Sequence, residues 1–96
     1  MSDTLLSNSD VSVSFHVLAD TCPGLLPRLL QPLAKRDLVA DDFHAKREGD
    51  AMRVEMALFA MPAEMVHLVA GNLGQVVGVQ EVQVVRHASA VLRRVA

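Results

Sequence analysis

The sequence predicts an α+β fold in which a four-stranded antiparallel sheet carries two helices on one face. Apolar and polar side chains alternate over residues 11–17 and again over residues 52–59, as they do in strands with one buried face. Leucine and valine recur at helical spacing over residues 26–33 and 65–73. The resulting order, strand, helix, strand, strand, helix, strand, is that of a split βαβ sandwich, βαββαβ.

Residues 11–37 are expected to form the first strand and the first helix. One face of the strand carries Val11, Val13, Phe15 and Val17, and the other carries Ser12, Ser14 and His16. The helix has an apolar stripe made of Leu26, Leu29, Leu30 and Leu33, and it ends near Lys35 and Arg36. A proline inside a helix removes a backbone donor and costs about 3 kcal/mol. Pro27 and Pro32 therefore predict either a kink near Pro32 or a delayed start of the helix.

Residues 38–61 are expected to form a hairpin. The segment 38–47 pairs with the segment 51–61 through a turn at Glu48-Gly49-Asp50. One face of the second strand carries Met52, Val54, Met56 and Leu58. The other sheet face is expected to meet solvent or a partner, and it carries Ser12, Ser14, His16, His44, Arg53 and Glu55.

A second helix and a last strand follow over residues 62–86. Pro62 suits the first helical position, and Gly74 suits a C-terminal cap. The apolar stripe of this helix consists of Met65, Leu68, Val69 and Leu73. In the last strand Val79 is out of phase with Val82 and Val84, which predicts a bulge near Gly78–Val79.

The 96 residues suit one domain, because a chain of this size has a single small core. We expect a flexible leader over residues 1–10, the folded domain over residues 11–87, and a tail or short helix over residues 88–96. A mean hydropathy of +0.29 is high for so small a domain, so part of the apolar surface is expected at a subunit interface.

The charge and the cysteine content limit the partners and the compartment. The net charge of −2 leaves no basic footprint for a phosphate backbone, so we expect no nucleic-acid partner. The single cysteine, Cys22, and the lack of a signal-peptide pattern favour the cytoplasm. No stretch is apolar enough to predict a membrane span.

No catalytic constellation, metal site or cofactor motif is evident. His16, His44, His67 and His87 lack the close spacing of zinc ligands. A metal-carrying domain of this topology would need Cys-x-x-Cys after the first strand, where this chain has one cysteine. With three phenylalanines and no tyrosine or tryptophan, the sheet also lacks a platform for stacking RNA bases. We therefore expect a binding module, not an enzyme.

The most informative segment is the junction at residues 20–24, Asp-Thr-Cys-Pro-Gly, between the first strand and the first helix. A glycine turn at a helix N-terminus can present free N–H groups to an anion. Alternatively, Pro23-Gly24 is a tight turn that binds nothing. A lowered pKa would make Cys22 reactive, but a passive small residue is the simpler reading.

The chain resembles the ACT domain family of ferredoxin-like folds in its order of elements and in two segments. These segments are Thr21-Cys22-Pro23-Gly24-Leu25-Leu26 and the closing Val76-Val77-Gly78-Val79-Gln80-Glu81-Val82-Gln83-Val84. The short length is most similar to the small regulatory subunit of acetolactate synthase, which senses branched-chain amino acids. The resemblance implies a homodimer with joined sheets and an amino-acid ligand where the first strand-to-helix loop meets the neighbouring chain.

This resemblance gives the candidate effector-binding residues, which are Thr21, Cys22, Pro23, Gly24, Leu25, Leu26 and Asp41. Asp41 is included because, over residues 39–41, it is the one side chain able to hold an amino group. The expected function is non-catalytic allosteric regulation of a larger enzyme by a small effector such as an amino acid. The alternative is an assembly module that binds no small molecule. Neither reading requires a cofactor or a metal.

Overall fold

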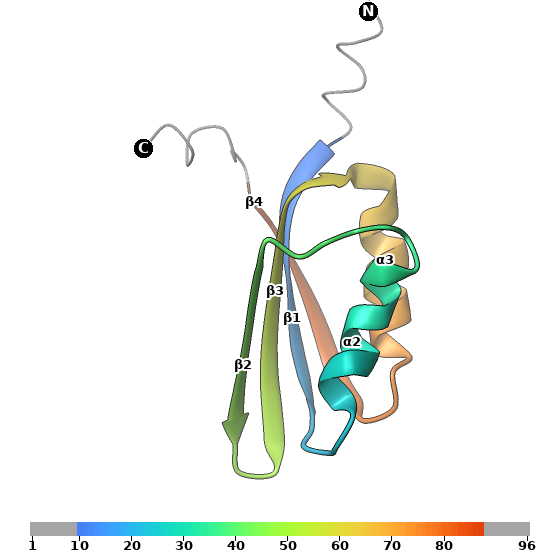
Figure 1. The fold of residues 1–96 in the computed structure, drawn as a ribbon. Coiled ribbons are helices and arrows are strands. Elements are labelled where there is room, and N and C mark those ends of the chain that lie inside the picture. Colours follow the sequence, from blue (N-terminus) through green and yellow to red (C-terminus); the bar gives the residue numbers. More distant parts are fainter. Residues whose placement is uncertain (1–9, 88–96) are drawn as a thin grey trace, which may run out of the picture.

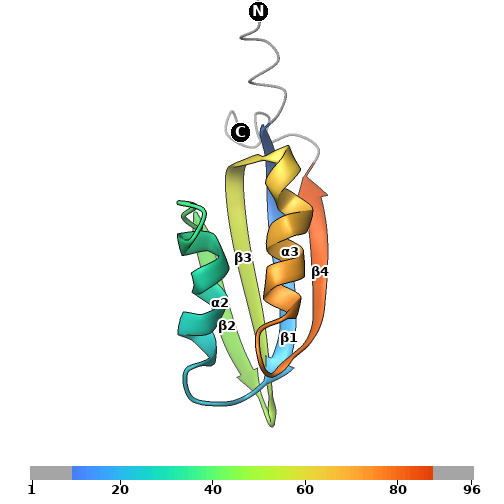
Figure 2. The same ribbon diagram turned by 90° about the vertical axis from the view of Figure 1, so that its right-hand side faces the viewer.

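The computed structural model describes residues 10–87. Their element order is β1 (Asp10–Asp20), α2 (Leu25–Ala34), β2 (Asp42–Glu48), β3 (Ala51–Pro62), a 3-10 turn η1 (Ala63–Met65), α3 (Val66–Gly74) and β4 (Val79–His87). The four strands form one antiparallel sheet in the order β2-β3-β1-β4. Both helices cover the same face of this sheet (Figures 1 and 2). The predicted fold class is confirmed. The leader expected over residues 1–10 overlaps the described residues only at Asp10, which begins β1. The rest of that leader and the tail expected over residues 88–96 lie outside the described residues.

The core lies between the sheet and the two helices. β1 is a central strand, and its Phe15 stands between Met56 of β3 and Val84 of β4 in the register. The predicted alternation is confirmed, because one face of β1 and β3 is buried and consists of Val13, Phe15, Val17, Val54, Met56 and Leu58. This apolar face gives the helices a surface to pack against, and its burial stabilises the fold.

α2 starts at Leu25 and continues through Pro32, so the expected delay of its start is not observed. Pro27 is the third helical residue, and a backbone N–H at that position has no partner within the helix. The missing N–H of proline therefore costs little stability there. The residues that α2 buries are Leu25, Leu29, Pro32 and Leu33. The predicted stripe was wrong for Leu30, which is 41% exposed. A step of 100° from Leu29 turns this side chain away from the sheet, and Pro32 occupies the buried place.

The expected helix start at Pro62 was also wrong. Pro62 is the last residue of β3, with an extended ψ of 127°, and η1 lies between it and α3. α3 buries Val66, Val69 and Leu73, whereas Leu68 is exposed. Gly74 ends the helix without a left-handed cap: Gln75 follows at φ −91°, and its N–H donates to Asn72 O. Neither helix of residues 10–87 has the length and hydropathy that a membrane crossing requires.

The hairpin and the bulge were predicted close to their observed places. β2 begins at Asp42, four residues later than expected, and the turn to β3 uses Gly49 with φ 63°. The register between β1 and β4 steps from Leu18 opposite Glu81 to Ala19 opposite Val79. This step leaves Gln80 as the extra residue of a bulge, next to the predicted position.

Candidate functional site

The junction between β1 and α2 lies at one end of the sheet, beside two other turns (Figure 1). Thr21 N–H donates to Asp50 O of the β2–β3 turn at 2.9 Å. Asp20 N–H donates to Gly78 O of the α3–β4 connection at 2.8 Å, and the Asp20 carboxylate accepts a hydrogen bond from the Gln80 side chain. Two connections far apart in the sequence, the β2–β3 turn and the α3–β4 connection, therefore hold the start of the loop in place.

Gly24 is the residue that turns the chain into α2. Its φ of 82° and ψ of 0° are left-handed, a conformation that glycine adopts without the steric cost other residues meet. Leu25 N–H already donates to Cys22 O at 3.3 Å, and Pro27 has no N–H. Within residues 10–87 the N–H groups of Gly24 and Leu26 have no hydrogen-bond partner. These two donors stand at the positive end of the α2 dipole, where an anion is favoured.

Arg28 adds a cation that sequence reasoning missed. Its Nη2 donates to Pro23 O at 3.2 Å, and a Cβ atom built on Gly24 would stand 3.2 Å from the same nitrogen. The guanidinium therefore lies over the glycine turn. Its spacing of four residues from Gly24, one helical turn, was a signal that could have placed it there.

Two side chains of the loop stand in semi-enclosed positions. The Thr21 hydroxyl is buried and has no hydrogen-bond partner among the described residues. The Cys22 thiol is half-buried and lies 3.9 Å from a Cβ built on Gly78. A buried hydroxyl without a partner costs roughly 1–3 kcal/mol, so Thr21 would gain from a ligand or a water molecule.

Asp41 does not join the loop within one chain. It lies at the opposite end of the sheet, where the connection from α2 reaches β2 (Figure 1). Its N–H donates to Ala57 O at 2.8 Å, and its Oδ2 accepts the Phe59 N–H at 2.7 Å. The carboxylate thus attaches the start of β2 to β3.

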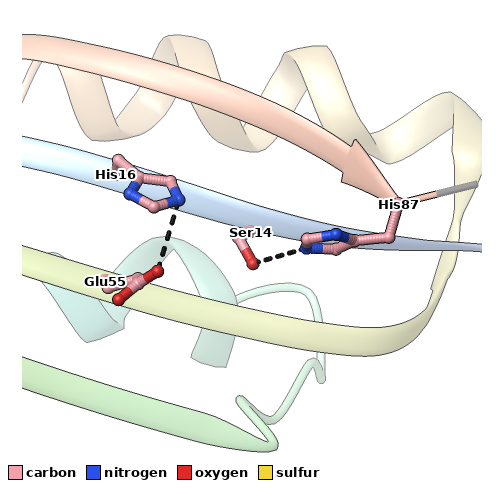
Figure 3. A network of polar contacts seen from close by, with 4 residues as sticks. All are labelled: Ser14, His16, Glu55 and His87. Carbon is pink, nitrogen blue, oxygen red and sulfur yellow. Dashed lines mark hydrogen bonds and ion pairs between the residues drawn. The ribbon is translucent and has the colours of Figure 1, made fainter. Parts of the chain in front are cut away.

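The open face of the sheet holds a second group of polar side chains (Figure 3). His16 Nε2 lies 3.4 Å from Glu55 Oε2, and both side chains are about half exposed. The expectation that Ser12 and Ser14 meet solvent or a partner was wrong, since both are buried within the single chain. These short side chains sit on a central strand beneath longer neighbours.

Ser14 Oγ and His87 Nε2 lie 2.9 Å apart, which is the spacing of a nucleophile and its base. The serine is only 5% exposed, however, and no carboxylate of residues 10–87 contacts the His87 ring to orient it. The hydrogen bond joins β1 to β4 on the open face of the sheet. Across the described part of the chain, no cluster of three or more His, Cys, Asp or Glu side chains could hold a metal ion.

Three hollows are among those on the surface of the described residues, and residues 21–26 line none of these three. The open sheet face carries two, of about 590 and 260 Å³, and they include His16 and Ser14 respectively. The third, of about 530 Å³, lies between the helices and includes Arg28.

The sequence profile of the ACT-like domain matches residues 6–91, nearly the whole chain. The chain belongs to the ACT-like domain family. ACT domains are in general regulatory modules that bind small molecules, and the predicted family resemblance is confirmed at this level. The narrower resemblance to the acetolactate synthase subunit is not established by the match.

Solved structures agree with the ACT-like fold. The ACT domain of a GTP pyrophosphokinase from Chlorobium tepidum is similar with a TM-score of 0.69 and 13% identity, covering 79% of this chain and 99% of that one. A homoserine dehydrogenase from Thiobacillus denitrificans is similar with a TM-score of 0.72 and 14% identity. The match covers 88% of this chain and 19% of the enzyme. The C-terminal domain of the MgtC protein from Mycobacterium tuberculosis is similar with a TM-score of 0.64 and 14% identity. The match covers 85% of this chain and 93% of that domain. No curated protein sequence matches the chain.

Proposed function

We propose that this ACT-like domain is a non-catalytic regulatory module whose loop at residues 21–26 binds the carboxylate of a small effector. The observation that carries the proposal is the start of α2. The free N–H groups of Gly24 and Leu26 and the guanidinium of Arg28 gather there, and no carboxylate of residues 10–87 pairs with that guanidinium. Charge-assisted hydrogen bonds from such donors suit a carboxylate better than a neutral group.

The effector site is proposed to be completed by a second copy of the chain joined through β2. This strand is an unpaired edge of the sheet, and six of its seven residues are exposed. In an antiparallel two-fold pair, the start of each β2 lies beside the end of the other. Asp41 of one copy would then approach the partner's β2–β3 turn, to which the loop is bound through Thr21 and Asp50. Asp41 could hold the amino group of an effector in this arrangement.

An amino acid is the effector class that fits a carboxylate site on one chain and an acidic side chain from the other. Branched-chain amino acids are the first candidates, and a larger catalytic subunit such as acetolactate synthase is the proposed recipient of the signal. Regulation of this kind requires a coupling free energy of about 1 to 3 kcal/mol between effector site and enzyme. The cytoplasm is the proposed compartment.

Calorimetric titration with Val, Leu, Ile and the other standard amino acids tests the effector. We expect one amino acid to bind and the variant Leu26→Pro, which removes one free N–H at the second helical position, to bind it more weakly. Leu30→Ala serves as the control on an exposed helical position. The absence of heat and of a thermal shift with every amino acid at about 1 mM, a weak affinity, would remove the effector from the proposal.

The alternative is an assembly module that contacts a larger enzyme and binds no small molecule. The engaged carboxylate of Asp41 favours it, because Oδ2 already accepts the Phe59 N–H. It predicts that affinity capture from the native extract recovers the same enzyme with the original chain and with Leu26→Pro. Loss of the enzyme with that variant would count against it.

A further inference from the structure

A groove of about 530 Å³ lies between α2 and the end of α3, on the helical side of the molecule. Figure 2 shows the two helices side by side on this face. Three cationic side chains, Arg28, Lys35 and Arg36, line it together with the side-chain amides of Gln31, Asn72 and Gln75. No Asp or Glu is among its lining residues.

The cations of this groove are not neutralised. Arg28 donates to the main-chain oxygen of Pro23, and Arg36 Nη2 donates to Asn72 Oδ1 at 2.9 Å, so neutral acceptors orient both guanidinium groups. Within residues 10–87, none of the three cations forms an ion pair, whereas Arg53 lies 2.8 Å from Glu48. Each guanidinium carries five N–H donors, so most of them remain available to an anion.

The positive charge of the groove is local. The whole chain carries a net charge of −2, so a general excess of basic residues does not explain three unpaired cations in one hollow. Arg28 and Lys35 are seven residues apart along α2 and its cap, which separates them by about 10 Å along the axis. The groove therefore offers cations that lie about two helical turns apart along α2.

Two apolar residues line the groove together with these cations. Pro32 is buried, and Val77 is 75% exposed. The volume falls within the roughly 300–1,000 Å³ of small-molecule sites. A hollow of this size, on a chain with excess negative charge, fits a small molecule better than an extended nucleic acid.

We propose that this groove binds a small organic molecule that carries two or more phosphate or carboxylate groups. The site is distinct from the proposed effector loop, because Lys35 and Arg36 lie at the far end of α2 from Gly24. Arg28 borders both places, so the decisive variants leave it unchanged.

Titration followed by amide NMR tests the proposal with three probes: a hexose bisphosphate, citrate and inorganic phosphate. We expect the bisphosphate or citrate to shift the side-chain amide signals of Gln31, Asn72 and Gln75 most strongly, and inorganic phosphate to bind at least about tenfold more weakly. Comparison of bisphosphate with citrate distinguishes a phosphate ligand from a polycarboxylate ligand. None of the probes is an amino acid, and the position of the shifts, at the groove residues or at residues 21–26, separates binding in the groove from anion binding at the effector loop.

The double variant Lys35→Gln/Arg36→Gln should weaken binding by about tenfold or more, since it removes two of the three cations. The control Lys46→Gln/Arg47→Gln removes the same charge from β2, outside the groove, and should change the affinity less than about twofold. Thermal unfolding checks that both variants fold. Equal weakening by the two double variants, shifts centred on residues 21–26, or no binding of any probe would overturn the proposal. Binding of an acidic peptide but of none of the three probes would also overturn it.

Discussion

The guanidinium of Arg28 covers Gly24: the same Nη2 atom that donates to Pro23 O would lie 3.2 Å from a Cβ at the glycine. The left-handed turn and the cation one helical turn later therefore form one unit. This unit places the positive end of α2 where a carboxylate could reach it, and its conformation can be tested separately from any ligand.

Gly24→Ala is expected to lower the free energy of unfolding by about 1–2 kcal/mol, because its φ of 82° is unfavourable for a residue with a Cβ. Gly71→Ala is the matched control. Gly71 lies inside α3, and a Cβ there would have no atom within 4 Å, so this variant should gain roughly 0.5–1 kcal/mol. Denaturant unfolding measures both. Equal changes in the two variants would show that the turn does not require glycine.

Leu29 and Leu30 differ in burial although they are neighbours in the sequence. Leu29 is 0% exposed and Leu30 is 41% exposed. Leu29→Ala should cost about 2–5 kcal/mol, because it leaves a cavity in the core. Leu30→Ala should cost less than about 1 kcal/mol unless another chain covers it. A large loss for Leu30→Ala that depends on protein concentration would reveal a subunit contact there.

Asp41→Ala should lower the free energy of unfolding by about 1 kcal/mol, because Oδ2 accepts the Phe59 N–H at the start of the hairpin. Asp41→Asn keeps an acceptor oxygen and should stay within about 0.5 kcal/mol of the original chain. The neighbouring Asp42→Ala serves as a surface control. If Asp41→Asn binds the effector as well as the original chain does, a role for the carboxylate charge in holding the amino group is excluded.

The proposed pairing through β2 predicts a disulfide between two copies of Ala45→Cys in a Cys22→Ser background. Ala45 lies at the middle of β2, so a two-fold antiparallel pair brings its two copies together within the Cα separation that a disulfide needs, about 4.4–6.8 Å. Gln83→Cys, at the middle of the other edge strand β4, should not cross-link. Non-reducing electrophoresis after mild oxidation measures the fraction of cross-linked dimer. The opposite pattern would move the dimer interface to β4 and leave Asp41 away from the partner's loop.

The strands were easier to predict than the helices. A period of two assigns each side chain of β1 and β3 to one of two faces, so Phe15 and Met56 were placed on the buried face from the pattern alone. A helix can be rotated about its axis by any angle, so the pattern alone does not fix which side chains face the sheet. The spacing of the apolar residues is compatible with a stripe made of Leu26, Leu29, Leu30 and Leu33. Only the packing of α2 on the sheet decides that Leu25 and Pro32 are buried in place of Leu30.

The start of the second helix was missed for a related reason. Pro62 is compatible with a helix start and with the end of a strand, since its φ of −57° suits both. Pairing with Asp10 across the sheet keeps it in β3. That partner is 52 residues away in the sequence, beyond the range of any local pattern.

By itself, the sequence determined the class of fold, the buried faces of β1 and β3, and the glycine corner at residue 24, because these follow from periodicity and from the backbone freedom of single residues. Only the tertiary structure decided which distant side chains meet. Asp41 contacts Phe59, and Arg36 contacts Asn72 across a cationic groove, because the sheet and the helix pair bring these residues together. Such contacts arise from the packing of whole elements, so they cannot be predicted from the residues that lie next to them in the sequence.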